Sequence, residues 1–305
     1  MVKANTKSVT VAILAYNRSD AFVRCIKSIA TDDTVQEVAV FDDCSAKDHF
    51  SVIEKACGQY KRVALNRNPV NLGYSQNLLQ ALYYLKKAKT PYAFLCESDM
   101  LLARDWGYYI DKAFELSSES VALSPNLTHY QLSRCFSQNL RHDHFKSYSQ
   151  NFLSKKANLK DDDSWEYIVN SEPLDIPYLR YGQFKLRYVS CSVGTLVFKT
   201  DFLRKIGVHL VELGNYSGRE DSWLSWACQY FNYNLQTSLI SLDPGLALAL
   251  GEPGLNGSAI TTNLRWHGNI LWRYSFISSA VRILYVVSEK IKARFLFHFR
   301  KYPFI

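Results

Sequence analysis

The sequence predicts an α/β fold with a mostly parallel central sheet and helices on both of its faces. Continuous apolar, β-branched runs such as Val9–Tyr16 are typical of central strands that are covered on both sides. These runs alternate with segments whose apolar residues recur at helical spacing, as Phe22, Ile26 and Ile29 do. Strands that alternate with helices favour a parallel sheet, which binds its ligands in the crevice outside the carboxyl ends of the strands.

Composition narrows the class of protein. The 305 residues suffice for one large α/β domain or two small ones, and the net charge of +8 favours nucleotides, anionic lipid or nucleic acid as partners. The seven cysteines are scattered and lack C-x-x-C spacing, which indicates a reduced compartment and neither a zinc site nor a disulfide framework. Met1–Ser8 is polar and no run of about eighteen apolar residues occurs, so we expect a cytoplasmic protein with no signal peptide and no spanning helix.

The first half of the chain reads as repeated strand-and-helix units. The predicted strands are Val9–Tyr16, Glu37–Phe41, Val63–Asn66 and an apolar run that begins at Tyr92. Asn17–Asp20 supplies a turn and a capping residue for the first helix. The later helices are predicted at Phe50–Cys57, from about Ser75 to Lys87, and from Trp106 to about Ser118, and a further strand at Val121–Ser124.

Polar residues follow each of the first four strands at its carboxyl end. They are Tyr16 and Asn17, then Asp42 and Asp43, then Asn66, and finally Glu97 and Asp99. Because parallel strands present their carboxyl ends at one edge of a sheet, we expect these groups to converge on a single rim.

Glu97-Ser98-Asp99 places two carboxylates one residue apart at the end of an apolar run. Alternate side chains of a strand share a face, so Glu97 and Asp99 can point the same way and would repel each other without a nearby cation. Hard oxygen ligands suit Mg²⁺ or Mn²⁺, whose shells phosphate oxygens often complete. The structural alternative is a strand that simply becomes polar where it leaves the core.

The second half carries fewer signals. Asn126–Gln183 lacks a sustained period and is interpreted as an insertion over the sheet that sets specificity, whereas Leu186–Phe198 again has strand-like composition. Glu220 and Asp221 open a predicted helix, where the helix dipole alone would favour them. Gly251–Ser258 has enough glycine to wrap around a ligand.

The tail mixes apolar and aromatic residues with many basic ones. It is predicted to form one or two amphipathic helices that either pack on the rest of the chain or lie on the inner face of an anionic membrane.

Four motifs, in this order, carry a resemblance to a known family. They are the opening V-T-V-A-I-L-A-Y-N-R, the acidic V-F-D-D-C-S, the loop N-L-G-Y-S-Q-N and the segment F-L-C-E-S-D-M-L-L-A-R-D-W. With these motifs the sequence resembles the family 2 glycosyltransferases, which have a Rossmann-like GT-A fold and use nucleotide sugars. The resemblance implies a GT-A domain over residues 1–265, with a donor half at 8–125 and an acceptor half at 126–265, followed by a helical tail at 266–305.

The resemblance also implies roles for individual residues on the donor side. Ala15, Tyr16 and Asn17 would line the base pocket, and Asp42 or Asp43 would hydrogen-bond the base or the ribose. Asn71, Gly73, Asn77 and Ser98 would complete the nucleotide-sugar site, although a glycine at a turn before a helix needs no ligand to explain it.

The metal and acceptor side is implied in the same way. Asp99 falls in the family's D-x-D motif and would bind Mn²⁺ or Mg²⁺, while Glu97, which replaces the usual first Asp, would join it or contact ribose or water. Asp221, with Glu220, matches the family's catalytic acidic pair. His267 would lie near the metal or diphosphate, although a lone histidine is more often structural, and Arg265 would neutralise diphosphate charge.

Together these expectations describe an inverting glycosyltransferase that moves a sugar, from a UDP-sugar as the expected donor, to a glycan or lipid-linked glycan in polysaccharide or glycoconjugate synthesis. One alternative is a metal-dependent nucleotidyltransferase, which the lack of a Gly-rich basic loop after the first strand disfavours. Another is a non-catalytic nucleotide- or carbohydrate-binding protein. A nucleic-acid partner is not expected, because the basic residues are not concentrated with aromatic ones in a single platform.

Overall fold

A computed structural model describes residues 7–126, 184–189, 195–206, 224, 227–228, 238–243 and 245–250. All of them belong to the first of two units into which the chain divides, Met1–Asn256. The second unit, Gly257–Ile305, lies outside the described residues and includes the tail for which the sequence predicts helices.

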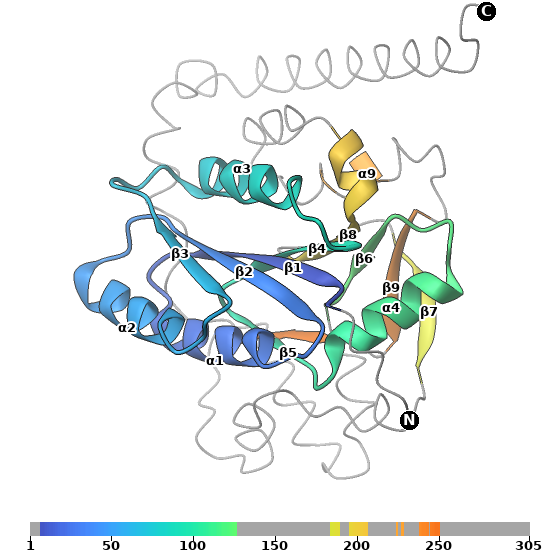
Figure 1. The fold of residues 1–305 in the computed structure, drawn as a ribbon, viewed down its shortest axis with the longest axis horizontal. Helices are drawn as coiled ribbons and strands as arrows, with labels where there is room; N and C mark the ends of the chain where they lie inside the picture. The colour runs from blue at the N-terminus through green and yellow to red at the C-terminus, as the bar shows by residue number, and fades with distance from the viewer. Residues whose placement is uncertain are drawn as a thin grey trace, which may run out of the picture. The chain divides into compact units, whose positions relative to one another are not determined.

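The described elements alternate between strand and helix through the first half of the chain, as Figure 1 shows. The strands of the main sheet are β1 (Val9–Ala15), β2 (Val35–Asp42), β3 (Val63–Arg67), β4 (Tyr92–Glu97), β6 (Ala122–Ser124), β7 (Lys185–Tyr188), β8 (Leu196–Lys199) and β9 (Leu239–Asp243). The helices are α1 (Ser19–Ala30), α2 (Lys47–Cys57), α3 (Tyr74–Leu85), α4 (Trp106–Leu116) and α9 (Thr200–Lys205). A two-stranded sheet pairs β5 (Met100–Leu102) with β10 (Ala247–Ala249).

The main sheet is mostly parallel, which confirms the predicted fold class. Its strand order is β3-β2-β1-β4-β8-β6-β9-β7, and β1 lies between β2 and β4 with both pairs parallel. β8 runs antiparallel to its neighbours β4 and β6, and β7 runs antiparallel to β9 at one edge. The continuous apolar runs form central strands because a helix layer covers each face of the sheet.

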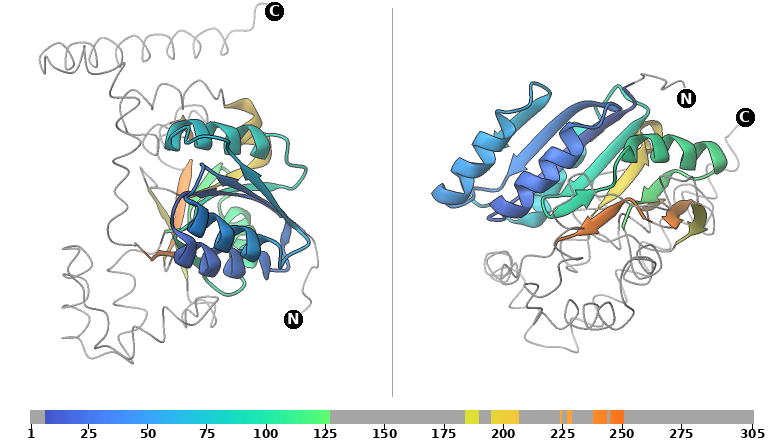
Figure 2. Two further views of the ribbon diagram at one scale, coloured as in Figure 1. Left: turned by 90° about the vertical axis from the view of Figure 1, so that its left-hand side faces the viewer. Right: turned by 90° about the horizontal axis from the view of Figure 1, so that it is seen from below.

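Two hydrophobic cores lie on opposite faces of this sheet. β1 sends Val11 and Ile13 to the core that contains α1, α2 and α4, and Ala12 and Leu14 to the core that contains α3 and α9. Figures 1 and 2 show the same layers, with α1 and α2 side by side on one face and α3 and α9 on the other. Each fully buried large side chain of these cores contributes about 1.5–3 kcal/mol to stability.

Trp106 fastens α4 to the first core. Its ring packs 5.1 Å from the ring of Phe94 between centroids, and its indole Nε1 donates to Ser28 O at 3.3 Å. Trp106 therefore packs α4 against both β4 and α1. This contact fixes where the chain turns after β5.

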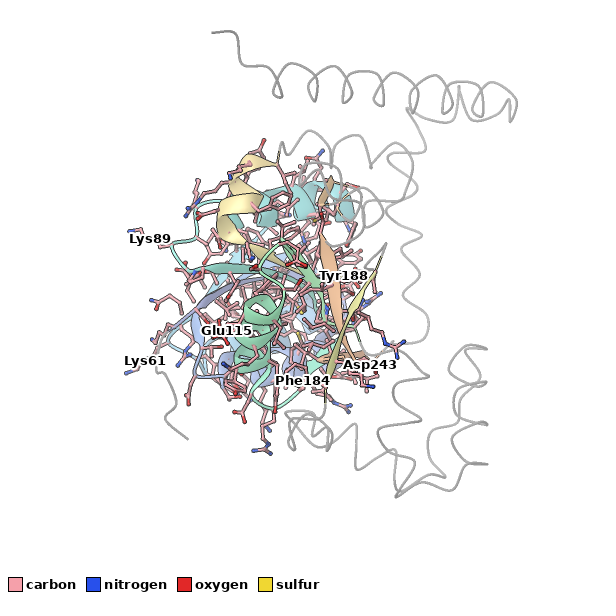
Figure 3. All side chains as sticks on the ribbon, turned by 90° about the vertical axis from the view of Figure 1, so that its right-hand side faces the viewer. Lys61, Lys89, Glu115, Phe184, Tyr188 and Asp243 are labelled. Atoms are coloured by element: carbon pink, nitrogen blue, oxygen red, sulfur yellow. The ribbon has the colours of Figure 1, made fainter. Side chains whose placement is uncertain are left out.

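The strand-like composition of Leu186–Phe198 is confirmed at both of its ends, which belong to different strands. One end belongs to β7, which pairs with β9 at the sheet edge, and the other to β8, which lies between β4 and β6. Strand-like composition does not show where a chain changes its place in a sheet. Figure 3 shows Phe184, Tyr188 and Asp243 along the β7 and β9 edge.

The sequence analysis did not single out β9 and β10. Its prediction of a capping residue at the start of α1 is wrong, because the residue at the N-cap position makes no side-chain capping hydrogen bond. Arg18 occupies the N-cap position, and Ser19 Oγ instead hydrogen-bonds His49 Nδ1 at 2.9 Å.

Among the described residues, no helix combines the length and the hydropathy that crossing a bilayer requires.

Candidate functional site

The carboxyl ends of β1, β2, β3 and β4 reach one edge of the main sheet. In the strand register, Ala15 lies beside Asp42, Leu14 beside Glu97, and Phe41 beside Asn66. The predicted convergence of the strand tips on one rim is therefore confirmed. We call this edge the donor rim, after the donor half that the sequence resemblance implies: it comprises the turn after β1, the loops after β2 and β3, and the turn after β4.

Asn17 ties the turn after β1 to the loop after β2. Its backbone N donates to Ser45 Oγ at 3.0 Å, and its side-chain Oδ1 accepts from Ala46 N at 2.7 Å. Ala15, just before it, is 2% exposed, and Tyr16 is half-buried. Two neighbouring loops of the donor rim are thereby held as one surface.

Asp42 is fully buried and its carboxylate is used within the protein. Ser45 donates to it from its backbone N at 3.1 Å and from its hydroxyl, and Arg67 Nε lies 3.6 Å from Asp42 Oδ2. Burial raises the pKa of the Asp42 carboxyl, although the Ser45 hydrogen bonds and Arg67 oppose the shift. Its predicted contact with the base or ribose stays a prediction.

Asp43 clamps the loop that connects β3 to α3. Its Oδ1 accepts from Asn68 Nδ2 at 2.9 Å and from Leu72 N at 2.8 Å, and its Oδ2 accepts from Gly73 N at 2.8 Å. Asn71 Oδ1 accepts from the same Gly73 N at 2.9 Å. One carboxylate thus sets the path of the loop that was predicted to pass close to a nucleotide.

Asn77 extends this network into α3. Its Nδ2 donates to Phe41 O at 2.9 Å, and its Oδ1 accepts from Asn68 Nδ2 at 3.3 Å. The residue is 3% exposed, so its amide is a buried link between the end of β2 and the start of α3. Asn77 thus lies in α3 beside the donor rim and links β2 to the loop after β3, while its predicted contact with the nucleotide sugar stays a prediction.

Left-handed backbone conformations gather at the same place. Among the described residues, those with positive φ are Asn17 (50°), Cys44 (60°), Gly73 (84°) and Asp105 (57°). The first three lie in loops of the donor rim. Sparsely populated backbone conformations often mark ligand-binding segments, because the surrounding hydrogen bonds must hold them in place.

The Glu97-Ser98-Asp99 motif forms the end of β4 and the turn that follows. The strand ends at Glu97, so the expectation that Glu97 and Asp99 share a strand face is wrong: Ser98 and Asp99 belong to a turn. Glu97 Oε1 accepts from the Tyr74 hydroxyl at 3.1 Å, and Asp99 Oδ2 lies 2.5 Å from Arg18 Nη1. The two carboxylates therefore have different partners.

Asp99 fits the role of a cation ligand. Its side chain is 9% exposed, and its Oδ1 is buried with no hydrogen-bond partner among the described residues. A buried carboxylate oxygen without a donor is costly unless a cation or another polar group completes it. Glu97, two residues away, offers a second hard oxygen donor, and such a donor set suits Mg²⁺ or Mn²⁺.

Four predicted site residues lie outside the described residues: Glu220, Asp221, Arg265 and His267. Within the described ranges no group of three or more His, Cys, Asp or Glu side chains could hold a metal. At the turn after β4 the structure describes the carboxylates of Glu97 and Asp99, and whether His267 or Asp221 joins them stays a prediction.

The sequence analysis missed the basic and neutral partners of the predicted carboxylates. Arg18 pairs with Asp99, Ser45 and Arg67 with Asp42, Asn68 with Asp43, and Tyr74 with Glu97. For Arg18 a signal existed, because it is a basic residue directly after a strand whose carboxyl end was already assigned to the rim. Tyr74 gave no such signal, since an aromatic residue at a helix start has many explanations.

Comparison with known proteins gives a family match. The family model described as "Glycosyl transferase family 2" matches residues 10–165, a range that contains the whole donor rim. No curated protein matches the chain.

Solved structures give a match of fold. The mannosyltransferase PcManGT from Pyrobaculum calidifontis, solved with GDP-Man and Mn²⁺, is 13% identical at a TM-score of 0.50, and the match covers 82% of this chain and 59% of that one. A fragment of TarS from S. aureus, residues 1–349, is 15% identical at a TM-score of 0.46, with 79% and 60% covered. The chain thus spans less than two thirds of the length of either protein.

Proposed function

Because the chain belongs to glycosyl transferase family 2 and its central sheet has the GT-A architecture, we propose that it transfers a sugar from a nucleotide diphosphate donor to an acceptor hydroxyl, inverting the anomeric carbon. The observation that carries this proposal is the convergence of Asn17, Asp43, Gly73 and Asp99 on one rim of the sheet.

The donor would bind along this rim. Asp43 holds the backbone of Leu72 and Gly73 in place, and Gly73 has no side chain to keep a nucleotide away from that backbone. Asn17 and the half-buried Tyr16 border the same edge of β1, where the base would lie. The loops therefore form a prearranged support for a nucleotide, and little ordering is needed when it binds.

Asp99, with Glu97, would hold Mn²⁺ or Mg²⁺, which when bound supplies charge stabilisation to the departing diphosphate. Arg18, beside Asp99, would add a guanidinium suited to phosphate oxygens. Asp221 would accept the proton of the acceptor hydroxyl as the new bond forms, as expected of a carboxylate general base. Asp221, Glu220, Arg265 and His267 enter this proposal from the sequence alone.

The acceptor side rests on sequence as well. A glycan or lipid-linked glycan is the proposed acceptor, and residues 126–183, most of which lie outside the described residues, are proposed to select it. The donor is proposed to be a UDP-sugar. Because PcManGT was solved with GDP-Man, a GDP-sugar is the natural competitor in the test.

The test combines binding with product formation. Calorimetry of the purified full chain with UDP, GDP and CMP, each with and without Mn²⁺, should show one nucleoside diphosphate binding more tightly when Mn²⁺ is present. Incubation with the matching nucleotide sugars should then release that nucleotide and form a glycosylated product. Transfer of a nucleotidyl group to the acceptor would identify a nucleotidyltransferase, and binding without any product would identify a non-catalytic nucleotide-binding protein; either result would overturn the proposal.

A further inference from the structure

Asp99 already forms an ion pair with Arg18, whose Nη1 lies 2.5 Å from Asp99 Oδ2. The two residues are 81 positions apart in the chain. The partners differ in freedom. The Asp99 side chain is 9% exposed and its backbone O accepts from Leu250 N at 2.7 Å, which fixes its turn against β10. The Arg18 side chain is 28% exposed. Arg18 is therefore the member of the pair that can leave.

The backbone of Arg18 stays in place when its side chain moves. Its carbonyl O accepts from Phe22 N at 2.8 Å in the first turn of α1. A long arginine side chain on a fixed backbone can reach a second position by rotating its χ angles alone. The guanidinium can thus exchange one oxyanion for another without any change in α1.

The other oxygen of Asp99 remains available to a second cation. Oδ1 is buried and has no hydrogen-bond partner among the described residues. A divalent ion that used this carboxylate would meet a guanidinium on the same group, and two like charges a few ångströms apart repel. Arg18 and a divalent ion therefore compete for Asp99.

We propose that Arg18 makes cation binding at Asp99 depend on the donor. Before the donor binds, Arg18 neutralises Asp99 and keeps the affinity for a free divalent ion low. When a nucleoside diphosphate arrives, its phosphate oxygens take over the guanidinium, which they can bind through two parallel hydrogen bonds, and Asp99 becomes available to the ion. The diphosphate and the divalent ion in this inference rest on the proposed function, whereas the pairing of Arg18 with Asp99 does not.

The coupling is reciprocal. If diphosphate binding strengthens cation binding through Arg18, the cation strengthens diphosphate binding by the same factor. Direct contact between a metal and a phosphate would also couple the two ligands. The distinctive consequence of the Arg18 exchange concerns the cation alone: removing the guanidinium should strengthen binding of Mn²⁺ in the absence of any nucleotide.

The experiment is titration of the full chain with MnCl₂ alone, followed by electron paramagnetic resonance of free Mn²⁺. Arg18→Met removes the charge and keeps an unbranched side chain, whereas Arg18→Lys keeps a charge. Lys27→Met, an exposed position on the same helix, is the matched control for the loss of one positive charge. Asp99→Asn reports whether the ion measured is the one at this carboxylate.

We expect Arg18→Met to lower the Kd for Mn²⁺ alone about fivefold or more, with Arg18→Lys and Lys27→Met close to the unaltered protein. Asp99→Asn should abolish the binding. Repeating the titration with UDP or GDP should show a smaller gain from the nucleotide in Arg18→Met than in the unaltered protein. Circular dichroism and the melting temperature confirm that each variant is folded.

Two results would overturn the inference. The first is an unchanged or weaker Mn²⁺ affinity in folded Arg18→Met. The second is that Mn²⁺ binds neither the unaltered protein nor Arg18→Met. In that case Arg18 is the permanent counterion of Asp99 and no exchange occurs. Neither result bears on glycosyl transfer, which is judged from product formation, and a protein that forms no product still yields a clear answer from the titration with Mn²⁺ alone.

Discussion

Asp42 and Asp43 are neighbours in sequence but serve different parts of the donor rim. Asp42 is fully buried and bound by Ser45 and Arg67, so it shapes the loop after β2. Asp43 reaches across to Leu72 and Gly73 and shapes the loop after β3. Asp42 is the last residue of β2 and Asp43 is the first residue of the loop that follows, and the two adjacent carboxylates hydrogen-bond to different loops.

The pH dependence of stability should reveal the burial of Asp42. Its pKa is raised above the ordinary value of 3.8, mainly by burial, so the folded protein holds this proton more tightly than the unfolded chain does. Its contribution to the free energy of unfolding is therefore greatest in acid and falls as pH rises through the raised pKa. The Asp42→Asn variant lacks this titration, and its amide NH₂ replaces one of the two oxygens that accept hydrogen bonds from Ser45. We expect this change to lower the free energy of unfolding by roughly 1–3 kcal/mol in acid.

The measurement is urea denaturation of the unaltered protein and of Asp42→Asn in a common buffer series from about pH 3.5 to pH 7, a range that spans the titration of a carboxyl. The stability advantage of the unaltered protein over Asp42→Asn should shrink toward neutral pH. Glu54→Gln, an exposed change on α2, should show no comparable trend. An advantage that grows with pH would contradict the burial argument.

Asp221 and Asp99 should differ in which kinetic parameter they control. Asp221→Asn should lower kcat about 10²- to 10⁴-fold, the typical contribution of a general base, and leave nucleotide binding largely intact. Asp99→Asn should instead weaken Mn²⁺-dependent donor binding. Steady-state kinetics with calorimetry separates the two effects. Asp201→Asn on α9, whose side chain is 87% exposed, is the control expected to behave as the unaltered protein, and normal turnover in Asp221→Asn would remove Asp221 from its role.

At the scale of elements, the strands set the positions of the loops that form the site, and side-chain hydrogen bonds hold these loops in their conformation. The loop between β3 and α3 is held by Asp43, Asn71 and Asn77. Its backbone turns at Gly73, where φ is 84° and ψ is 158°. A residue with a Cβ is strained in that conformation, so the loop can take this path because residue 73 is glycine.

Gly73→Ala should therefore destabilise this loop. We expect a loss of roughly 1–3 kcal/mol in stability and weaker nucleotide binding, since the strain falls on the backbone that Asp43 holds. Gly58→Ala is the matched control, because a Cβ there would meet only ordinary contacts of 3.5 Å and 3.6 Å with helix carbonyls. Chemical denaturation and nucleotide calorimetry on both variants give the comparison. Equal effects at the two glycines would show that the conformation of Gly73 does not matter.

Element boundaries were predictable where a strand and its neighbours form one local unit. The predicted Val63–Asn66 and Trp106–Ser118 differ from β3 and α4 by a residue or two at their ends. Composition indicated strand in the region of β7 and β8, but neither their boundaries and pairing nor the existence of β9 was predictable in this way. Their partners are distant in the chain, as when Leu186 pairs with Leu242, and short segments of mixed composition do not encode such pairing locally.

At the scale of the whole molecule, charge is distributed unevenly along the sequence. Residues 266–305 hold seven Lys or Arg residues and one Glu, whereas the net charge of all 305 residues is +8. Most of the excess positive charge therefore belongs to the tail. The predicted contact of this segment with an anionic membrane stays a prediction, because the segment lies outside the described residues.

Charge reversal tests that contact on the full chain. Lys290→Glu combined with Lys292→Glu should reduce cosedimentation with phosphatidylserine vesicles at low salt at least about tenfold, because each basic residue near such a surface contributes about 1 kcal/mol. Lys61→Glu with Lys89→Glu changes the net charge equally, at exposed positions that Figure 3 shows extending from the surface. Equal losses in both double variants, or no vesicle binding by the unaltered protein, would rule out a membrane role for the tail.

The sequence by itself determined the alternation of strands and helices, the polar tips of β1 to β4 and the family, because each of these is written in local runs of residue types. The tertiary structure alone decided which groups meet at the donor rim. Arg18 faces Asp99, Tyr74 faces Glu97, and Asp43 binds Gly73 N. These partners lie 81, 23 and 30 residues apart, and their meeting depends on strand register and helix packing, which no local pattern records.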